Sequence, residues 1–303
     1  MNRKSFIRTS ALTLGAFAIS NQKLFAGFYG EPAWKITMLT DEIGIFNERG
    51  GTILFYMGKE GNIVVDCQWP ETVTNLIGQL KQKNPQPFEL IINTHHHLPC
   101  TSGNIAFKDL AKNFIAHENS KSNQIRNAKL MRSENNSHYP NLTYKNTWCE
   151  KFGKENICLY NFGAGHTNGD TIVHFEYADI VHMGDLVFNR RHPGIDRTAG
   201  ASIKNWNEVL NKAYYLFGRK TKFVFGYSGE GHSVVGTKED LKAFSNYLSQ
   251  LLIFTENEIK KGKPKKDIIK NSAIPGTPEW RGDGLDRTLA AAFDELTLDV
   301  IPE

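Results

Sequence analysis

Apolar residues recur along the chain with two different spacings, which predicts a mixture of strands and helices. Short apolar or alternating runs bounded by turn residues predict strands at 34–39, 43–46, 52–57, 62–65, 88–92, 171–175, 180–185 and 223–226. Apolar residues three and four apart predict helices at 71–82, 108–131, 206–217, 238–261 and 285–296. Within the second of these helical segments, 113–116 looks like a strand. The pattern as a whole predicts an α/β fold with a helical C-terminal end.

Three consecutive histidines follow directly after the predicted strand at 88–92. In extended backbone, side chains two residues apart point the same way. His95 and His97 can therefore bind one metal ion, while His96 points elsewhere. Taken alone, the motif is more typical of a polar, turn-rich loop that happens to be rich in histidine.

Three later segments offer further ligands at the ends of predicted strands. His166 precedes one strand, Asp185 ends the next, and His232 follows the last. Loops and strand ends on a rigid sheet are where binding sites are usually assembled. Imidazole is a common zinc ligand, and a zinc site that keeps three protein ligands and a water molecule is suited to hydrolysis.

The order and spacing of these motifs resemble those of the metallo-β-lactamase superfamily, over roughly residues 34–235. The first motif of that family is Thr-His-x-His-x-Asp-His, followed by a turn of a small residue, Gly and Asn. Thr94, His95 and His97 fit this motif, and residues 102–104 continue it in register. The resemblance implies an αβ/βα four-layer sandwich with the metal at the edge between the two sheets.

The resemblance also implies roles for residues further along the chain. His166 matches the later histidine ligand, and His232 matches the last one. Asp185 matches the aspartate that bridges the metals and holds the nucleophile, so we expect it to be catalytic. Asp66, at the end of the strand 62–65, matches the buried aspartate that supports the metal loop.

The chain departs from the family where the first motif has Asp and then His. Pro99 offers neither a side-chain oxygen nor an amide hydrogen, whereas the thiolate of Cys100 is a competent soft zinc ligand. The expected metal ligands are therefore His95, His97, Cys100, His166, Asp185 and His232. We expect one or two zinc ions, and a hydrolase that is slower or narrower than a typical family member.

Four cysteines allow three complete disulfide pairings. Cys149 and Cys158 are close in sequence and could staple a turn. Cys67 and Cys100 have two interpretations. Either Cys100 is a free thiolate that binds metal, or it forms a disulfide with Cys67 and is lost to the metal.

Residues 1–26 have the pattern of a secretory signal peptide. A basic start precedes the mostly apolar run 11–19, and cleavage is expected after Ala26. Residues 3–7, Arg-Lys-Ser-Phe-Ile, resemble a twin-arginine export signal with lysine in the second place. We expect an exported, periplasmic protein whose residues 27–303 form a single domain with a C-terminal helical extension. The other interpretation is a flexible tail or an uncleaved anchor at a lipid surface.

The charge of the chain is concentrated in that leader. The formal net charge is +4, and residues 1–26 hold four basic residues and no acidic one, so the remaining 32 basic residues balance 32 acidic ones. This balance gives no basic excess for nucleic acid or an anionic membrane. No apolar stretch reaches the roughly 20 residues that a membrane span requires. The expected partner is a small-molecule substrate.

The expected reaction is attack of metal-bound hydroxide on a small ester, thioester or amide (lactam) substrate. Arg191 and His192 follow Asp185 and are expected beside the cleft, where arginine could hold an anionic group of the substrate. A solvated rim loop is the other interpretation of this segment.

Two alternatives to a zinc hydrolase stay open on the sequence. One is a mononuclear iron enzyme that resembles sulfur dioxygenases and uses His95, His166 and Asp185 as a face of two histidines and one carboxylate. The other is a binder of metal or ligand that has lost catalysis together with the missing aspartate.

Overall fold

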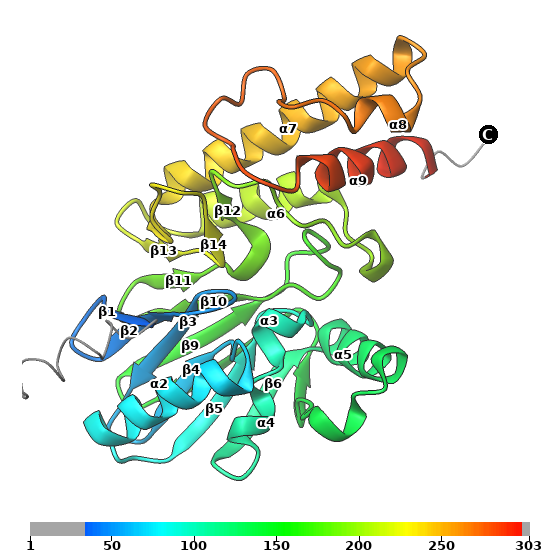
Figure 1. Ribbon diagram of the computed structural model, residues 1–303. Helices are drawn as coiled ribbons and strands as arrows, with labels where there is room; N and C mark the ends of the chain where they lie inside the picture. The colour runs from blue at the N-terminus through cyan, green and yellow to red at the C-terminus, as the bar shows by residue number, and fades with distance from the viewer. Residues whose placement is uncertain (1–33, 299–303) are drawn as a thin grey trace, which may run out of the picture. The chain divides into compact units, whose positions relative to one another are not determined.

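Two sheets lie face to face, with helices on the outer side of each (Figure 1). The computed structural model describes residues 34–298. Nearly all of these belong to one compact unit, Ile36–Glu303. The predicted signal peptide lies outside the described residues, and the domain boundary after residue 26 stays a prediction.

The first sheet contains seven strands in chain order. They are β1 (Lys35–Met38), β2 (Ile43–Asn47), β3 (Ile53–Met57), β4 (Asn62–Val65), β5 (Phe88–Asn93), β6 (Ala111–His117) and β7 (Leu142–Tyr144). The pairs β2–β3 and β3–β4 are antiparallel, whereas β4 to β7 run parallel. Parallel neighbours need crossover connections. The helices α2 (Pro70–Lys83) and α5 (Glu118–Met131) lie within two of these connections, and the short helices α3 (Leu98–Thr101) and α4 (Asn104–Phe107) follow β5.

The second sheet has six strands and is mostly antiparallel. Their order is β15 (Val235–Gly236), β13 (Lys222–Val224), β11 (Ile180–His182), β10 (Ile172–Phe175), β9 (Glu155–Tyr160) and β8 (Thr147–Phe152). A small third sheet pairs β12 (Phe188–Asn189) with β14 (Tyr227–Ser228). The helix α6 (Ile203–Leu216) precedes β13, and α7 (Lys238–Lys260), α8 (Lys265–Ile268) and α9 (Leu285–Leu298) follow β15.

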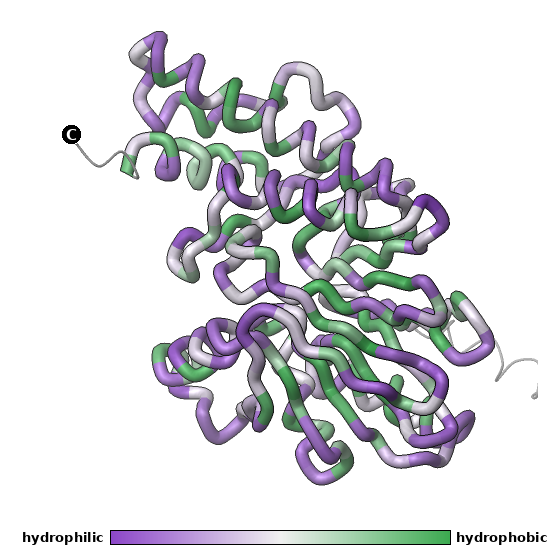
Figure 2. Tube along the Cα trace, turned by 180° about the vertical axis from the view of Figure 1, so that it is seen from behind, coloured by the Kyte–Doolittle hydropathy of each residue, from purple (hydrophilic) through white to green (hydrophobic). Residues whose placement is uncertain are grey.

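Two hydrophobic cores hold these layers together. One lies between the sheets, where Leu54 and Ile92 of the first sheet belong to the same buried cluster as Phe175 of the second. The other lies between the second sheet and its helices, and includes Trp206 and Phe244. Figure 2 shows hydrophobic residues along the strands and polar residues on the outer turns and loops. The α/β fold, an αβ/βα four-layer sandwich, is therefore confirmed.

The segment 108–131 was expected to be largely helical with a strand at 113–116; the strand is confirmed and is longer than expected, and the helix is shorter. Residues Ala111–His117 form the strand β6, and the helix α5 begins only at Glu118. The backbone of β6 is bonded to β5 on one side and β7 on the other. Pairing on both edges decides the conformation here, although alanine, lysine and asparagine favour strands only weakly.

The four cysteines form one disulfide and leave two free thiols. Cys149 and Cys158 face each other on β8 and β9 and form a disulfide, which confirms the predicted staple. Cys67 and Cys100 are both buried and free. The alternative of a disulfide between them is wrong for this structure. Within residues 34–298, none of the helices has both the length and the apolar content needed to cross a membrane.

Candidate metal centre

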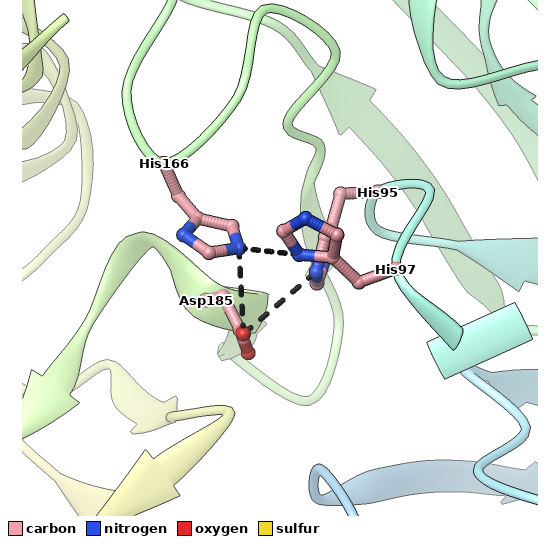
Figure 3. A group of neighbouring side chains, drawn as sticks. All are labelled: His95, His97, His166 and Asp185. Carbon is pink, nitrogen blue, oxygen red and sulfur yellow. Dashed lines mark hydrogen bonds and ion pairs between the residues drawn. The ribbon is translucent and has the colours of Figure 1, made fainter. Parts of the chain in front are cut away.

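Four side chains from three separate segments converge at one edge of the sandwich (Figure 3). His95 and His97 follow β5, His166 lies in the loop between β9 and β10, and Asp185 follows β11. One ligand atom of each lies within 4.8 Å of all the others. His97 is half-buried, and the other three are buried. Of the residues that the sequence nominated as metal ligands, these four are brought together.

Asp66 supports the loop that carries the first two histidines. It follows β4 with a left-handed backbone (φ 65°), and its carboxylate accepts hydrogen bonds from the Thr94 amide at 2.8 Å and the Thr94 hydroxyl at 2.7 Å. Burial raises the pKa of Asp66 to about 7, although the hydrogen bonds from Thr94 partly oppose this rise. Because the Thr94 hydroxyl donates to Asp66, it can only accept from His95 Nδ1, which lies 3.1 Å away. The Nε2 atom of His95 therefore faces the cluster without a proton.

The loop of His166 is fixed in a similar way. Asp170 accepts hydrogen bonds from the Thr167 amide at 2.9 Å and the Thr167 hydroxyl at 2.6 Å, which closes the turn after His166. His166 Nδ1 lies 2.8 Å from the carbonyl oxygen of Gly194. A carbonyl can only accept, so Nδ1 carries the proton and Nε2 points into the cluster with its lone pair.

His97 is oriented by a carboxylate. Its Nε2 atom lies 2.9 Å from Asp196 Oδ2. Although burial pushes the pKa of Asp196 upward, hydrogen bonds from His96 and His97 hold it well below its usual range. A neutral His97 donates its Nε2 hydrogen to this carboxylate and keeps a lone pair on Nδ1. Nδ1 lies 2.9 Å from His166 Nε2, so the two nitrogens are close enough to bind one cation.

The electrostatics of the cluster favour a cation between these atoms. Burial and the neighbouring imidazoles lower the pKa values of His95 and His166, which keeps both rings neutral. Asp185 Oδ2 lies 3.7 Å from His95 Nε2 and 3.6 Å from His166 Nε2. Asp185 Oδ1 is buried and has no hydrogen-bond partner in the described part of the chain. Three imidazole nitrogens and a carboxylate oxygen within 4.8 Å of one another are a donor set suited to a divalent metal ion.

Cys100 lies beside this cluster. Its Sγ atom is 3.9 Å from His95 Nε2, and burial, with Asp66 and Asp185 nearby, raises the pKa of the thiol. Pro99 stands in the first turn of α3, where a missing amide hydrogen costs no helical bond. Its ring lines the hollow without offering a ligand.

His232 does not join the cluster, contrary to the expectation from the family motif. Its side chain is exposed and lines a separate hollow with Arg190, Glu230 and Arg281. The backbone turns at Gly229, whose carbonyl accepts from the His232 amide at 3.0 Å. The second set of expected ligands, Cys100, Asp185 and His232, is therefore not assembled.

The cluster opens into a hollow of about 440 Å³. Both residues that the sequence nominated for substrate binding line it. Arg191 is exposed and lies over the ring of Tyr227, 5.1 Å from its centroid. His192 is buried, and its Nδ1 atom lies 2.8 Å from the hydroxyl of Tyr247. Its position is thus set by packing.

Four further residues at this site were missed by the sequence analysis. They are Asp196, Tyr227, Asp283 and Arg287. Tyr227 could have been found, because it directly follows the predicted strand 223–226. Nothing local distinguishes Asp196 from a surface aspartate, and the other two lie far along the chain from every motif.

Comparisons with known proteins agree with this architecture. Residues 47–226 match the family model described as the metallo-beta-lactamase superfamily. A metallo-beta-lactamase from Pontibacter korlensis has a TM-score of 0.58 at 19% identity, covering 71% of this chain and 99% of that one. A crystal structure of VMB-1 has a TM-score of 0.57 at 20% identity, covering 72% of this chain and 98% of that one. At this identity both show a shared fold alone. No curated protein matches the chain significantly.

Proposed function

Because the chain belongs to the metallo-beta-lactamase superfamily, whose members are commonly metal-dependent hydrolases, we propose that it is a hydrolase that works with a divalent metal ion. Zinc is the expected ion, and a small ester, thioester or amide (lactam) is the expected substrate. The observation that carries the proposal is the convergence of three histidines and one aspartate, whose ligand atoms all lie within 4.8 Å of one another.

Zinc in such a site would lower the pKa of water toward ~7 and polarise the carbonyl group under attack. The residues of the chain supply positioning and proton transfer. Asp185 would hold the ion through Oδ2, the oxygen that lies nearest to His95 and His166. Its other oxygen, Oδ1, has no hydrogen-bond partner among the described residues and could accept a proton from the attacking water.

Tyr227 is placed to act on the substrate oxygen, whereas Asp185 acts on the attacking water. Its ring lines the hollow and stacks on Phe188, with 5.6 Å between the ring centroids. Burial, with Asp185 and Cys100 nearby, raises the pKa of Tyr227, so the phenol stays protonated. A protonated phenol can donate a hydrogen bond to the negative charge that develops on the substrate oxygen.

One observation favours a second candidate, an iron-dependent oxygenase. Asp185 Oδ2 lies at nearly equal distances from His95 and His166, 3.7 Å and 3.6 Å. Two histidines and one carboxylate on one face are typical of non-haem iron sites. Metal analysis separates the two candidates, because tightly bound iron with an oxygen-dependent reaction would contradict the zinc hydrolase.

The direct test is hydrolysis by protein stripped of metal and then reloaded with zinc or iron. The panel should contain an aryl ester, a thioester and a β-lactam. We expect zinc to restore turnover of at least one substrate, and His166→Ala to abolish it. His138→Ala is the matched control, because His138 lines a different hollow and packs on Phe114. Absence of turnover on all three substrates with either metal would contradict the proposal.

We also propose export to the periplasm, supported by the basic and apolar pattern of residues 1–26. The mature protein should begin at Gly27 when it is recovered from the periplasm. Replacing Arg3 and Lys4 together by glutamine should keep the protein in the cytoplasm with its leader attached. Wild-type protein recovered with Met1 intact, or a double variant exported and cleaved like the wild type, would contradict export.

A further inference from the structure

The C-terminal part of the chain forms one wall of the metal hollow. Asp283, Gly284 and Arg287 line it, together with Arg191 from the loop after β12. These three wall residues lie well beyond residue 226, where the match to the family model ends. The wall is therefore an addition of this chain's C-terminal segment.

This wall is fastened to the loop that carries Arg191. The backbone of Arg281 pairs with that of Arg191 in a parallel bridge. Thr288 is buried and donates its hydroxyl hydrogen to the carbonyl of Pro193 at 2.9 Å. Backbone pairing and a buried hydrogen bond fix the two segments beside each other.

An aromatic stack strengthens the same junction. Trp280 stacks on Tyr247 of α7 with 4.8 Å between the ring centroids, and the Tyr247 hydroxyl holds His192 at 2.8 Å. The Arg190 guanidinium lies 5.1 Å from the centre of the Trp280 ring. Tyr247 therefore contacts both segments: the C-terminal wall through Trp280, and the loop that carries Arg191 through His192.

Two guanidinium groups that line this hollow, those of Arg191 and Arg287, have no anionic partner among the described residues. Arg190 forms ion pairs with Asp240 at 3.0 Å and Glu279 at 3.3 Å. By contrast, Arg191 and Arg287 have neither an ion pair nor a hydrogen bond to any residue in the range 34–298. Asp283 lines the same wall but lies beyond 4.0 Å from both guanidinium groups.

The position of Arg287 follows from the glycine before the helix. Gly284 has a left-handed backbone (φ 102°), and a Cβ atom there would lie 3.5 Å from Arg287 Nη2. The guanidinium therefore lies over the backbone that lines the hollow. Arg191 stands on the neighbouring wall, over the ring of Tyr227.

We propose that Arg191 and Arg287 together bind an oxyanion of the substrate, a carboxylate or a phosphate, at the end remote from the bond that is cleaved. The planar fork of arginine matches both groups and binds either in a bidentate manner. This inference rests on the proposed function for the location of the cleaved bond. It narrows the substrate class to esters, thioesters or amides that carry a second, negatively charged group.

A binding measurement tests the inference without turnover. Zinc-loaded protein is titrated by calorimetry with glutarate, with 4-phosphonobutyrate and with glutaramate, in which one carboxylate of glutarate is replaced by an amide. We expect glutarate or 4-phosphonobutyrate to bind at least about tenfold more tightly than glutaramate, because a charge-assisted hydrogen bond is worth about this factor. The tighter of these two ligands identifies the oxyanion. Equal affinities for all three would overturn the inference.

Three variants test whether Arg287 causes the preference for glutarate or 4-phosphonobutyrate over glutaramate. Arg287→Gln should remove most of this preference, and Arg287→Lys should restore part of it. Arg281→Gln is the matched control, because Arg281 is an exposed arginine of the same segment whose side chain lines the other hollow. A full preference in Arg287→Gln, or its loss in Arg281→Gln, would contradict the assignment.

Turnover measurements distinguish a failure of this inference from a failure of the proposed function. The monoester of glutaric acid with 4-nitrophenol is compared with the neutral ester 4-nitrophenyl valerate. Arg287→Gln should raise KM about tenfold for the charged ester alone, with little change in kcat for either. If neither ester is hydrolysed, the proposed ester hydrolase fails, while the calorimetric preference still decides whether the wall binds an oxyanion.

Discussion

Asp196 faces two neighbouring imidazoles, with its Oδ2 atom 2.9 Å from His97 and 3.4 Å from His96. A carboxylate behind a metal-binding histidine fixes the ring and its tautomer. Asp196→Asn should therefore weaken metal binding by about 10- to 100-fold, measured by competition with a chelating dye. Asp283→Asn is the control, because Asp283 lines the hollow without contacting a histidine. An unchanged affinity in Asp196→Asn would show that this carboxylate does not orient His97.

Asp66 makes the stability of the metal-free protein depend on pH. Its pKa is raised by burial from 3.8 to about 7 in the folded state. Between pH 4 and 7 the folded protein keeps the Asp66 proton, whereas the unfolded chain has released it. The stability that this proton contributes is therefore complete below about pH 4 and is lost as the pH rises to 7. Relative to Asp66→Asn, the wild type should lose up to about 4 kcal/mol of unfolding free energy over this range.

Urea unfolding at several pH values, with a chelator present, measures this difference. Asp41→Asn replaces an exposed aspartate, so its difference from the wild type should stay constant across the same range. A constant difference for Asp66→Asn as well would mean that Asp66 ionises alike in the folded and unfolded chains.

At the level of single residues, the sequence identified the side chains whose chemistry is rare and missed those whose chemistry is common. His95, His97 and His166 stand in motifs with a distinctive spacing, so their convergence could be predicted. Asp196 is one of 32 acidic residues, and only the folded loop brings it to His97. The tautomers of the histidines also depend on partners that local sequence does not reveal.

Among the elements, the end of β13 places Gly226 directly against the metal centre. A Cβ atom at Gly226 would lie 2.2 Å from Asp185 Oδ1 and 2.9 Å from the carbonyl oxygen of Gly184. Gly226→Ala should therefore displace Asp185, weaken metal binding and reduce stability by about 1–3 kcal/mol. Gly218→Ala is the control, because its nearest neighbour would be 3.5 Å away. Wild-type metal affinity in Gly226→Ala would contradict this close approach.

Strand ends were harder to predict than the strands themselves. The segment 180–185 was expected to be a strand up to its last residue. β11 ends at His182, and Gly184, with φ of 52°, turns the chain into a short 3-10 helix, Gly184–Leu186. That turn brings Asp185 to the histidines. Hydrophobic periodicity shows that a strand exists, but the site depends on where its backbone turns.

On the scale of the whole molecule, the last helix is joined to the middle of the chain through Glu295. This buried carboxylate accepts hydrogen bonds from the amides of Ile203 at 2.7 Å and Lys204 at 2.9 Å, at the start of α6. Glu295→Gln should lower the unfolding free energy by about 1–3 kcal/mol, measured by urea denaturation. Glu256→Gln removes an exposed carboxylate of α7 and should have little effect. Equal stability of both variants would contradict this joining role.

The resemblance to the superfamily predicted the layers correctly, because strand and helix patterns decide which faces are buried. It was less informative about the site. His232 has the expected place in sequence, yet a turn directs it into another hollow. The C-terminal wall with Arg287 lies outside the matched region, so no family motif could indicate it.

Metal content per chain tests the central claim most directly. The structure assembles one set of ligands, His95, His97, His166 and Asp185, and leaves the second set apart. Protein purified without a histidine tag and analysed by plasma mass spectrometry should hold about one zinc ion per chain. His166→Ala should lose that ion. Protein free of transition metal after zinc loading, or two ions held equally tightly per chain, would contradict the account.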